Sequence, residues 1–244
     1  MTSLACVEVG GSGCQTVVFD DSSWLTLDGA HRPDGTDLAI AAPGYLRDGR
    51  VMWASNLGWR DVDPAEQLGL TGPSLVLLND AEAAALGEAA LRADAGRAAV
   101  VAAGLTFVGV GTGIGGAVID DGRVTATNLF GHASGFSSLP CPCGRVGCLE
   151  TVAAGWALPD EIDRSTQRNV AGALAAAIEA EPRAAHTLVV IGGGLVAAHP
   201  YVVEVVSGLL PGRRVEPSAA PGEAKSASAW GLRHVVEGLT TPGV

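Results

Sequence analysis

Three of the five cysteines lie close together, at Cys141, Cys143 and Cys148. Such a cluster, in a chain that we expect to be cytoplasmic, indicates a metal site before disulfides. Thiolates of this spacing can wrap a tetrahedral zinc ion, and His132 offers the fourth ligand. A Cys3His set is closed to substrate, so we expect a structural zinc site. The alternative is a group of reduced, unliganded thiols.

Two glycine-rich turns each join two apolar runs, and they are Gly10-Gly11-Ser12-Gly13 and Gly111-Thr112-Gly113-Ile114-Gly115-Gly116. Glycine lets backbone N–H groups converge on an anion without a Cβ in the way. Either turn alone is as easily a plain hairpin. The pair, at matching places in a repeated plan, predicts that the turns hold a nucleotide phosphate chain from both sides. Neither is a Walker A loop, because no Gly-Lys-Ser/Thr follows.

Asp80 follows the apolar run Ser74–Leu78 and precedes an alanine-rich helical segment. A carboxylate between a strand end and a helix start stands where α/β proteins bind ligands. It can accept a proton from a substrate hydroxyl. The competing interpretation is a helix N-cap, a role that either Asn79 or Asp80 could fill.

The pattern of apolar runs predicts a mixed α/β chain in which the second half restarts the plan of the first. Strands are expected at 4–9, 14–20, 22–27, 38–42, 74–78, 99–110, 117–120, 123–127 and 188–191. Helices are expected at 81–88, 171–180, 201–210 and 225–236, and mostly loop at 45–73. We expect a domain boundary near 92–98, giving domains of residues 1–95 and 96–244, with the last helix packing back on the first domain.

Composition excludes several classes of protein. With 48% hydrophobic and 17% charged residues, the 244-residue chain is neither disordered nor fibrous. A net charge of −11 argues against a nucleic-acid partner and against binding to membranes through basic patches. No apolar run is long enough to span a bilayer, and the first residues lack a basic signal-peptide region. We therefore expect a cytoplasmic protein.

Four segments together resemble the ROK family of bacterial sugar kinases and related repressors. They are Asn79-Asp80-Ala81-Glu82-Ala83-Ala84-Ala85-Leu86-Gly87-Glu88, Gly111–Gly116, Gly131-His132 and Cys141-Pro142-Cys143-Gly144-Arg145-Val146-Gly147-Cys148-Leu149-Glu150. Their order and spacing match over nearly the whole chain, and the cysteine segment is highly specific. The repressor branch carries a DNA-binding helix-turn-helix before its first strand. The early first strand and the acidity disfavour that branch.

The resemblance implies an actin-like ATPase fold of two domains around a cleft, with ATP-Mg²⁺ as phosphoryl donor and a sugar hydroxyl as acceptor. By the same resemblance Asp80 matches the general base, Asn79 and Glu150 match ligands of sugar hydroxyls, and Gly44 lies near the sugar. His132 matches a residue that both binds zinc and faces the sugar. The implied nucleotide-binding residues are Glu8, Gly10, Gly11, Ser12, Gly111, Thr112 and Gly113 at the phosphates, with Gly192, Gly193 and Gly194 near adenine. This set is chemically sufficient for phosphoryl transfer.

The sequence also departs from the family pattern. Glu8 replaces an aspartate, Gly13 replaces a lysine, and Leu129 stands where the family has a sugar-binding glutamate. Segments are missing before Asp37 and between 155 and 170, where the family has helices. An alternative is therefore a catalytically impaired protein that binds sugar or nucleotide, or a partner subunit. The family expectation for the assembly is a homodimer, which would cover apolar faces that the missing helices expose.

Overall fold

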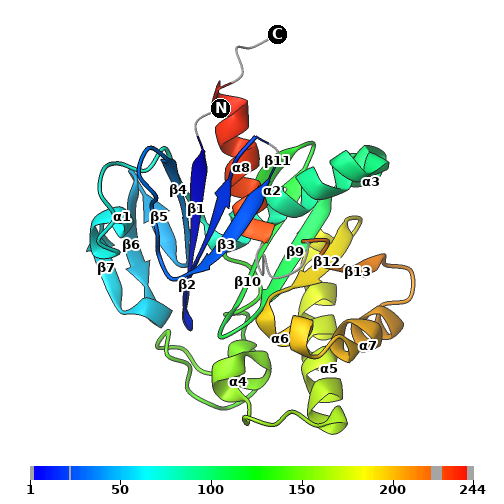
Figure 1. Cartoon of the computed structure of the whole chain (residues 1–244). Helices are drawn as coiled ribbons and strands as arrows, with labels where there is room; N and C mark the ends of the chain where they lie inside the picture. Colours follow the sequence, from blue (N-terminus) through cyan, green and yellow to red (C-terminus); the bar gives the residue numbers. More distant parts are fainter. Residues whose placement is uncertain (1–2, 22, 221–226, 241–244) are drawn as a thin grey trace. The chain divides into compact units, whose positions relative to one another are not determined.

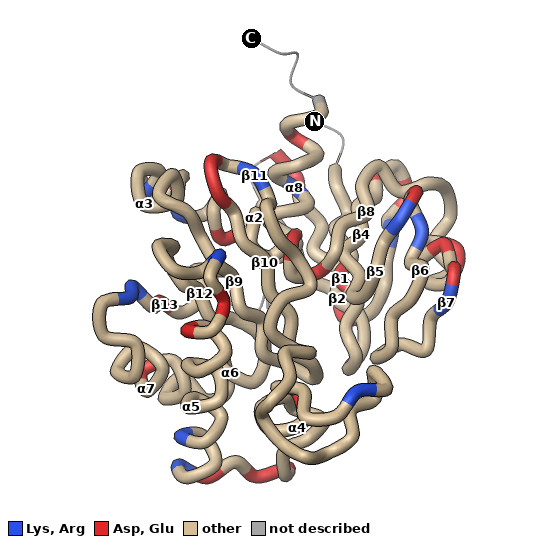
Figure 2. The backbone as a smooth tube through the Cα atoms, turned by 180° about the vertical axis from the view of Figure 1, so that it is seen from behind, with Lys and Arg blue, Asp and Glu red and all other residues tan. Residues whose placement is uncertain are grey.

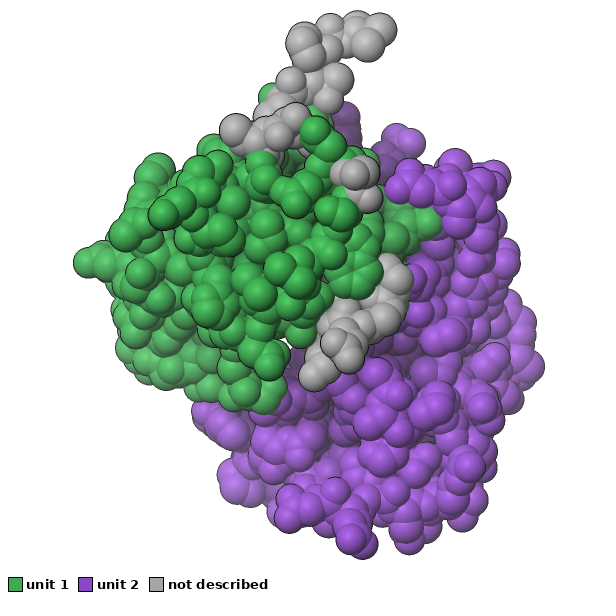
Figure 3. Space-filling view, viewed as in Figure 1, with its two compact units in different colours: residues 1–91, 220–244 green, residues 92–219 purple. Residues whose placement is uncertain are grey.

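The computed structural model describes residues 3–21, 23–220 and 227–240 of the chain. The chain forms two compact units, one of residues 1–91 with 220–244 and one of residues 92–219, coloured separately in Figure 3. Each unit is built around its own five-stranded sheet. We describe the units one at a time.

The sheet of unit 1 has the order β3-β2-β1-β4-β8. Its strands are β1 (Leu4–Gly10), β2 (Gly13–Phe19), β3 (Trp24–Asp28), β4 (Asp37–Ala42) and β8 (Val76–Asn79). The first three strands form antiparallel hairpins, whereas β1, β4 and β8 run parallel to one another. The carboxyl ends of these three parallel strands therefore meet at one edge of the sheet.

The sheet of unit 2 repeats this plan in the order β11-β10-β9-β12-β13. Its strands are β9 (Leu105–Val110), β10 (Ile114–Asp120), β11 (Arg123–Ala126), β12 (Leu188–Gly192) and β13 (Val215–Pro217). Antiparallel pairing again links the first three strands, and β9, β12 and β13 are parallel. The predicted repeat is thus a repeat of a whole sheet, including both glycine turns.

Helices α2 (Asp80–Arg92) and α8 (Ala227–Thr240) belong to unit 1, where α8 contacts β1, β2, β4 and β8. The two helices meet at glycines. A Cβ on Gly87 would lie 1.8 Å from the Ala227 carbonyl oxygen, and one on Gly231 would lie 1.8 Å from the Ala83 carbonyl oxygen. Only glycine permits this approach of two helix backbones. Leu232 and Val236 of α8 pack with the apolar side chains of the sheet.

The other face of this sheet packs against a small three-stranded sheet and a short helix. These are β5 (Tyr45–Arg47), β6 (Arg50–Ala54), β7 (Trp59–Val62) and α1 (Pro64–Gln67), with a 3₁₀ turn at Ser55–Leu57. The prediction of mostly loop over 45–73 was wrong. The strands are too short to show periodicity, but Asp48 and Gly49, with φ of 50° and 72°, form the kind of turn that joins hairpin strands.

In unit 2, helices α5 (Arg164–Ala180) and α7 (Tyr201–Leu209) cover one face of the sheet (Figure 1). The shorter elements are α3 (Ala98–Ala102), α4 (Glu150–Ala153), α6 (Gly194–Ala198), a π-helical turn at Ala93–Arg97, and 3₁₀ turns at Gly155–Ala157 and Pro182–Ala184. The strand expected over 99–110 was wrong in its first half, where α3 ends before Gly104, whose φ is +98°. The expected start of the last helix, at 225–226, lies outside the described residues.

The connection between β3 and β4 in unit 1 consists only of residues 29–36. Parallel strands are usually joined by a dozen or more residues that include a helix, as α5 does between β11 and β12 of unit 2. On the edge strand β3, Leu25 is 60% exposed.

Charged residues are sparse along the chain, and Figure 2 shows them as short segments of either sign without a long basic stretch. Among the described residues, no helix combines the length and the apolar character that crossing a bilayer requires.

Candidate active site

Asn79 and Asp80 lie at the junction of β8 and α2, and their side chains make different contacts. The Asn79 side-chain oxygen accepts hydrogen bonds from the backbone amides of Ala81 (3.1 Å) and Glu82 (3.3 Å). Asn79 is therefore the N-cap of α2. The Asp80 carboxylate accepts a hydrogen bond of 2.8 Å from the neighbouring Ala81 amide, and Asp80 is half-buried. Asn79 thus caps α2, and the Asp80 carboxylate is not needed as the helix cap.

The environment of Asp80 disfavours its charged form. Burial, the main cause, together with the negative charge of Glu8 raises the pKa of the Asp80 carboxyl to about 6, although amide hydrogen bonds lower it. Glu8 lies near the end of β1, one of the strands parallel to β8. A carboxylate with a pKa close to neutrality is suited to accept a proton at physiological pH.

Gly44 joins this edge from the end of β4. Its carbonyl oxygen accepts a hydrogen bond of 3.2 Å from the Asn79 side-chain amide. Its φ is +102°, and a Cβ there would lie 2.2 Å from the carbonyl oxygen of Trp53. Both the backbone conformation and the space therefore require glycine at this position. Unit 1 thus gathers Glu8, Gly44, Asn79 and Asp80 at the carboxyl edge of its parallel strands.

The two glycine turns are the hairpin loops of β1–β2 and of β9–β10. In the first, Gly10 pairs with Gly13, which leaves Gly11 and Ser12 exposed at the tip. In the second, Val110 pairs with Ile114 across Gly111, Thr112 and Gly113, which are half-buried. We call residues 111–113 the second glycine turn. Both loops have backbone free of bulky side chains at the place where a phosphate would be bound.

Gly192, Gly193 and Gly194 lie where β12 ends and α6 begins, beside the second glycine turn. A Cβ on Gly193 would lie 2.5 Å from the Val110 carbonyl oxygen, at the end of β9. The φ and ψ of Gly193 are 98° and 162°, a conformation open essentially to glycine alone. Gly193 is therefore needed for the close approach of these two strand ends, whereas an added Cβ on Gly194 would meet no atom within 4 Å.

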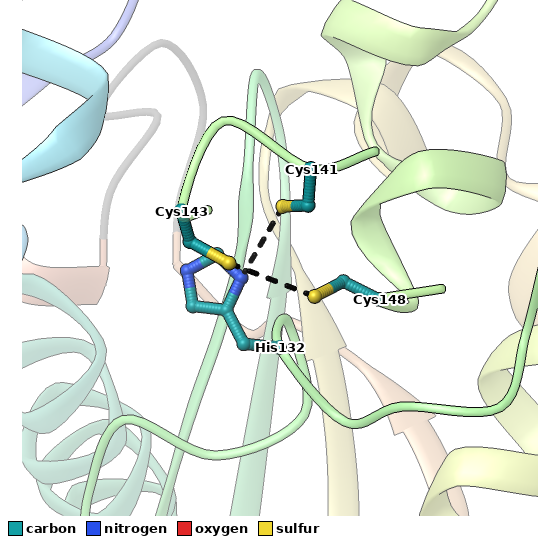
Figure 4. A group of neighbouring side chains, drawn as sticks. All are labelled: His132, Cys141, Cys143 and Cys148. Atoms are coloured by element: carbon teal, nitrogen blue, oxygen red, sulfur yellow. Dashed lines mark hydrogen bonds between the residues drawn. The ribbon is translucent and has the colours of Figure 1, made fainter. Parts of the chain in front are cut away.

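His132 and three cysteines form the side-chain cluster in Figure 4, and their ligand atoms lie within 4.8 Å of one another. The Sγ atoms of Cys143 and Cys148 are 3.7 Å apart, and Cys141 Sγ is 3.7 Å from His132 Nδ1. Sulfurs bound to zinc at about 2.3 Å in a tetrahedron are about 3.8 Å apart, so the spacing fits a shared zinc ion and is too long for a disulfide. All three cysteines are free thiols. We call residues 132–148 the metal loop.

Glu150 starts α4 directly after the metal loop and is 3% exposed. Its Oε1 accepts a hydrogen bond of 2.7 Å from the backbone amide of Ile114. Its Oε2 lies 3.4 Å from Trp156 Nε1 and 3.8 Å from His132 Nδ1. The expected sugar ligand is thus also bonded inside unit 2, although a carboxylate with four acceptor positions can still take a hydroxyl.

Leu129, which we expect at the place of a family glutamate, lies in the apolar core of unit 2. It is 8% exposed and packs among buried residues that include Val118 and Leu149. Its neighbours Asn128 and Phe130 have φ of 56° and 70°, so the backbone turns sharply on both sides of it. Leu129 is therefore a part of the apolar core.

Sequence reasoning missed the segment that follows Glu150. The amides of Gly155 and Trp156 donate hydrogen bonds to the carbonyl oxygens of Gly111 (2.8 Å) and Thr112 (3.2 Å). Bonds between backbone groups leave no mark in residue types. Gly155 is the one residue of this contact whose type reflects it, because an added Cβ there would lie 2.9 Å from the Gly111 carbonyl oxygen.

Comparison with known proteins connects this geometry to a family. A profile described as the ROK family matches residues 27–187, which is more than half of the chain. A glucokinase of Halalkalibacterium halodurans is 33% identical over 156 residues, covering 59% of this chain and 46% of that protein. An N-acetylmannosamine kinase of Citrobacter koseri is 36% identical over 131 residues, covering 48% of this chain and 42% of that protein. The match thus spans about half the length of these curated relatives.

Among solved structures, one similar chain is a ROK family glucokinase from Streptomyces griseus in complex with glucose and AMPPNP. The TM-score is 0.69 at 20% sequence identity, and the alignment covers 94% of this chain and 98% of that chain. At that identity the likeness establishes a shared fold and nothing more.

Proposed function

The chain belongs to the ROK family and has the actin-like ATPase fold of its structural relatives, and from that premise we propose that it is an ATP-dependent sugar kinase. It would transfer the γ-phosphoryl group of ATP to a hydroxyl of a hexose or an amino sugar. The names of its relatives, glucokinase and N-acetylmannosamine kinase, support this substrate class. The substrates are a small sugar and ATP with Mg²⁺.

Asp80 is the observation that carries the proposal. Its carboxylate stands at the carboxyl edge of the parallel strands, relieved of helix capping by Asn79, with its pKa raised to about 6. In the proposed reaction this carboxylate accepts the proton of the sugar hydroxyl. The hydroxyl oxygen forms a bond to the γ-phosphorus, the bond from that phosphorus to the bridging oxygen breaks, and ADP leaves.

The other residues position the reactants. We assign the acceptor sugar to Gly44, Asn79, His132 and Glu150. We assign the phosphate chain to Gly10, Gly11, Ser12, Gly111, Thr112 and Gly113, adenine to Gly192–Gly194, and the magnesium-bound nucleotide to Glu8. Mg²⁺ binds carboxylate oxygens and phosphates, and when bound it neutralises charge that develops on the transferred group. Glu8 fits this role because its carboxylate is close enough to Asp80 to raise the pKa of Asp80.

We propose that Cys141, Cys143, Cys148 and the Nδ1 atom of His132 hold a structural zinc ion. The spacing of the ligand atoms supports this. Zinc at Nδ1 fixes the ring of His132 and leaves Nε2 available to a sugar hydroxyl. The metal would then shape the sugar pocket without taking part in the reaction.

A second candidate is a family member that binds sugar or nucleotide without turnover. The observation that favours it is the burial of Leu129 at the place of the missing glutamate. Release of ADP, measured by a coupled assay with a panel of hexoses and amino sugars, separates the two. Turnover with at least one sugar supports the kinase. Binding of sugar or ADP by calorimetry, with no turnover on any sugar, supports the second candidate.

We also propose a homodimer. Its support is Leu25, which is 60% exposed where unit 1 has no crossover helix. Light scattering after size-exclusion chromatography distinguishes a dimer from the 24.5 kDa monomer.

A further inference from the structure

We propose that Glu150 is a positioning residue that couples the metal loop to the second glycine turn. Zinc in the metal loop would then control the order of that turn and its affinity for nucleotide phosphate, in addition to any effect on the sugar. The identity of the phosphate ligand rests on the proposed function. The coupling itself rests on contacts inside unit 2.

The first contact joins Glu150 to the chain directly after the turn. Its Oε1 atom accepts a 2.7 Å hydrogen bond from the backbone amide of Ile114, and both groups are buried. A bond from an amide to a carboxylate is stronger than one between neutral groups. If the carboxylate is removed, a buried amide loses its partner, which is costly. The position of the turn therefore depends on Glu150.

Two backbone contacts reinforce the first. The amides of Gly155 and Trp156 donate to the carbonyl oxygens of Gly111 and Thr112, at 2.8 and 3.2 Å. Gly155 lies so close to the turn that an added Cβ would be 2.9 Å from the Gly111 oxygen. The segment 150–156 therefore lies against the turn and fixes its backbone along most of its length.

The same glutamate is held from the other side by the metal loop. The Glu150 amide donates to the carbonyl oxygen of Gly131 (3.0 Å), and the Leu149 amide donates to that of Ala133 (2.9 Å). These two bonds bracket His132, whose Nδ1 atom is 3.8 Å from the Glu150 carboxylate. Cys148, another proposed ligand, is two residues before Glu150. The bonds of Glu150 and of its neighbour Leu149 thus both adjoin proposed zinc ligands.

Metal binding at such a site contributes folding energy to the loop that supplies the ligands. When zinc holds His132 and Cys148 together, it holds Gly131 against Glu150, and Glu150 against Ile114. Without the metal the two sides of the loop are free to separate. The second glycine turn then loses its fixed support although none of its own residues has changed.

Hydrogen exchange of the Ile114 amide, followed by NMR on the whole chain, tests the coupling without any substrate. We expect exchange to be at least about tenfold faster after zinc is removed with a chelator, and equally in Glu150→Ala. Glu150→Gln retains a carbonyl acceptor and should restore much of the protection. Glu179→Gln, on the exposed side of α5, is the matched control and should leave exchange unchanged. Unchanged exchange at Ile114 after chelation, in protein whose circular dichroism stays native, overturns the proposal.

Calorimetric titration with ADP then tests the consequence for ligand binding. We expect the Kd for ADP to rise about tenfold or more on chelation and in Glu150→Ala, and to return toward the wild-type value in Glu150→Gln. If Glu150→Ala does not fold, Trp156→Phe removes the Nε1 donor alone and should give a smaller change in the same direction. If the wild type does not bind ADP, the proposed function fails, whereas the exchange experiment still decides the coupling. ADP binding that is indifferent to zinc contradicts the inference.

Discussion

At the scale of single residues, the most informative side chain is Asp80. Its carboxylate is kept in surroundings that oppose its charge, because burial and the Glu8 charge both raise its pKa. Groups with such shifted pKa values concentrate at functional sites, because catalytic acids and bases need a pKa matched to their reaction. The sequence could place Asp80 at a strand end but could not choose between a cap and a base. The position of the Asn79 side chain identifies Asn79 as the cap, and the role of Asp80 as a base stays a prediction.

Replacing Asp80 by asparagine should leave the fold equally stable or more stable at pH 7.5. The pKa rises from 3.8 to about 6 on folding, so ionisation begins to oppose folding above pH 3.8 and does so fully above about pH 6. The variant removes this penalty, which is at most about 3 kcal/mol. The difference between variant and wild type should shrink as pH falls below about 6 and vanish below about pH 3, where the carboxyl is protonated in both states. Urea unfolding at both pH values measures it, and a variant less stable at pH 7.5 would contradict the account.

Leu129→Glu restores the family residue type but should destabilise the protein. Leu129 is packed in the core of unit 2, and an unpaired buried carboxylate costs about 3–5 kcal/mol. The loss should be smaller at acidic pH, where the new side chain is protonated. Leu129→Met, which conserves volume, should cost less than about 1.5 kcal/mol. If Leu129→Glu instead keeps wild-type stability and binds sugar more tightly, residue 129 contacts the sugar, and its placement in the core is contradicted.

At the scale of elements, most of the two main sheets was predictable, since their strands are apolar runs bounded by glycine turns. The small sheet β5–β7 was not, because its strands are too short for periodicity. Helix α3 was also missed, since Ala98–Ala102 and the following strand form one apolar run that only the φ of Gly104 divides. Helices α2 and α8 are far apart in the sequence, so no local sequence pattern predicts their contact.

The glycines between α2 and α8 give a matched pair of substitutions on one helix. Gly231→Ala places a methyl group 1.8 Å from the Ala83 carbonyl oxygen and should destabilise the protein by about 1–3 kcal/mol or more. Gly238→Ala, with open space around it, should be neutral or stabilise by up to about 1 kcal/mol. Urea denaturation compares them. Equal effects of the two substitutions would mean that the helices do not approach as described.

The metal loop is expected to bind a fixed number of zinc ions per chain. Elemental analysis of freshly purified protein should give about one zinc per chain, because a Cys3His set is a closed site for one ion. Cys143→Ser should lose the metal and lower the Tm, since the binding energy is part of the folding energy. Cys14→Ser, outside the cluster, is the control and should keep the metal. Wild-type protein without zinc would remove the structural role proposed for the loop.

At the scale of the whole molecule, the chain contains one sheet plan twice, and each copy carries part of the proposed site. Unit 1 supplies the acid–base group and one glycine turn, and unit 2 supplies the second turn, the triple glycine and the metal loop. The sequence predicted this division from the cysteine spacing and the two turns, and it stays a prediction. The network around Glu150 was not, since it depends on backbone amides and carbonyls that any residue provides.

The two sheets differ in how their third strand is connected to the fourth strand in chain order. Unit 2 retains α5 as the crossover helix of its sheet, whereas unit 1 crosses with residues 29–36 alone. The loss lies away from Asp80 in sequence and leaves the carboxyl edge of β1, β4 and β8 in place. Unit 1 therefore still holds Glu8, Asn79 and Asp80, the residues to which we assign magnesium binding, sugar binding and proton transfer, at one edge of its sheet.

The rate of ADP release as a function of pH, for the wild type and for Asp80→Asn with the best sugar of the panel, tests the central claim most directly. We expect the wild-type kcat/KM to fall as pH drops below about 6, because a protonated Asp80 cannot accept the hydroxyl proton. The variant should be slower by about 10²–10⁴-fold and should lack this pH dependence. A variant that releases ADP at the wild-type rate, or a wild type that releases none with any sugar, would contradict the proposal that the protein is a sugar kinase with Asp80 as its base.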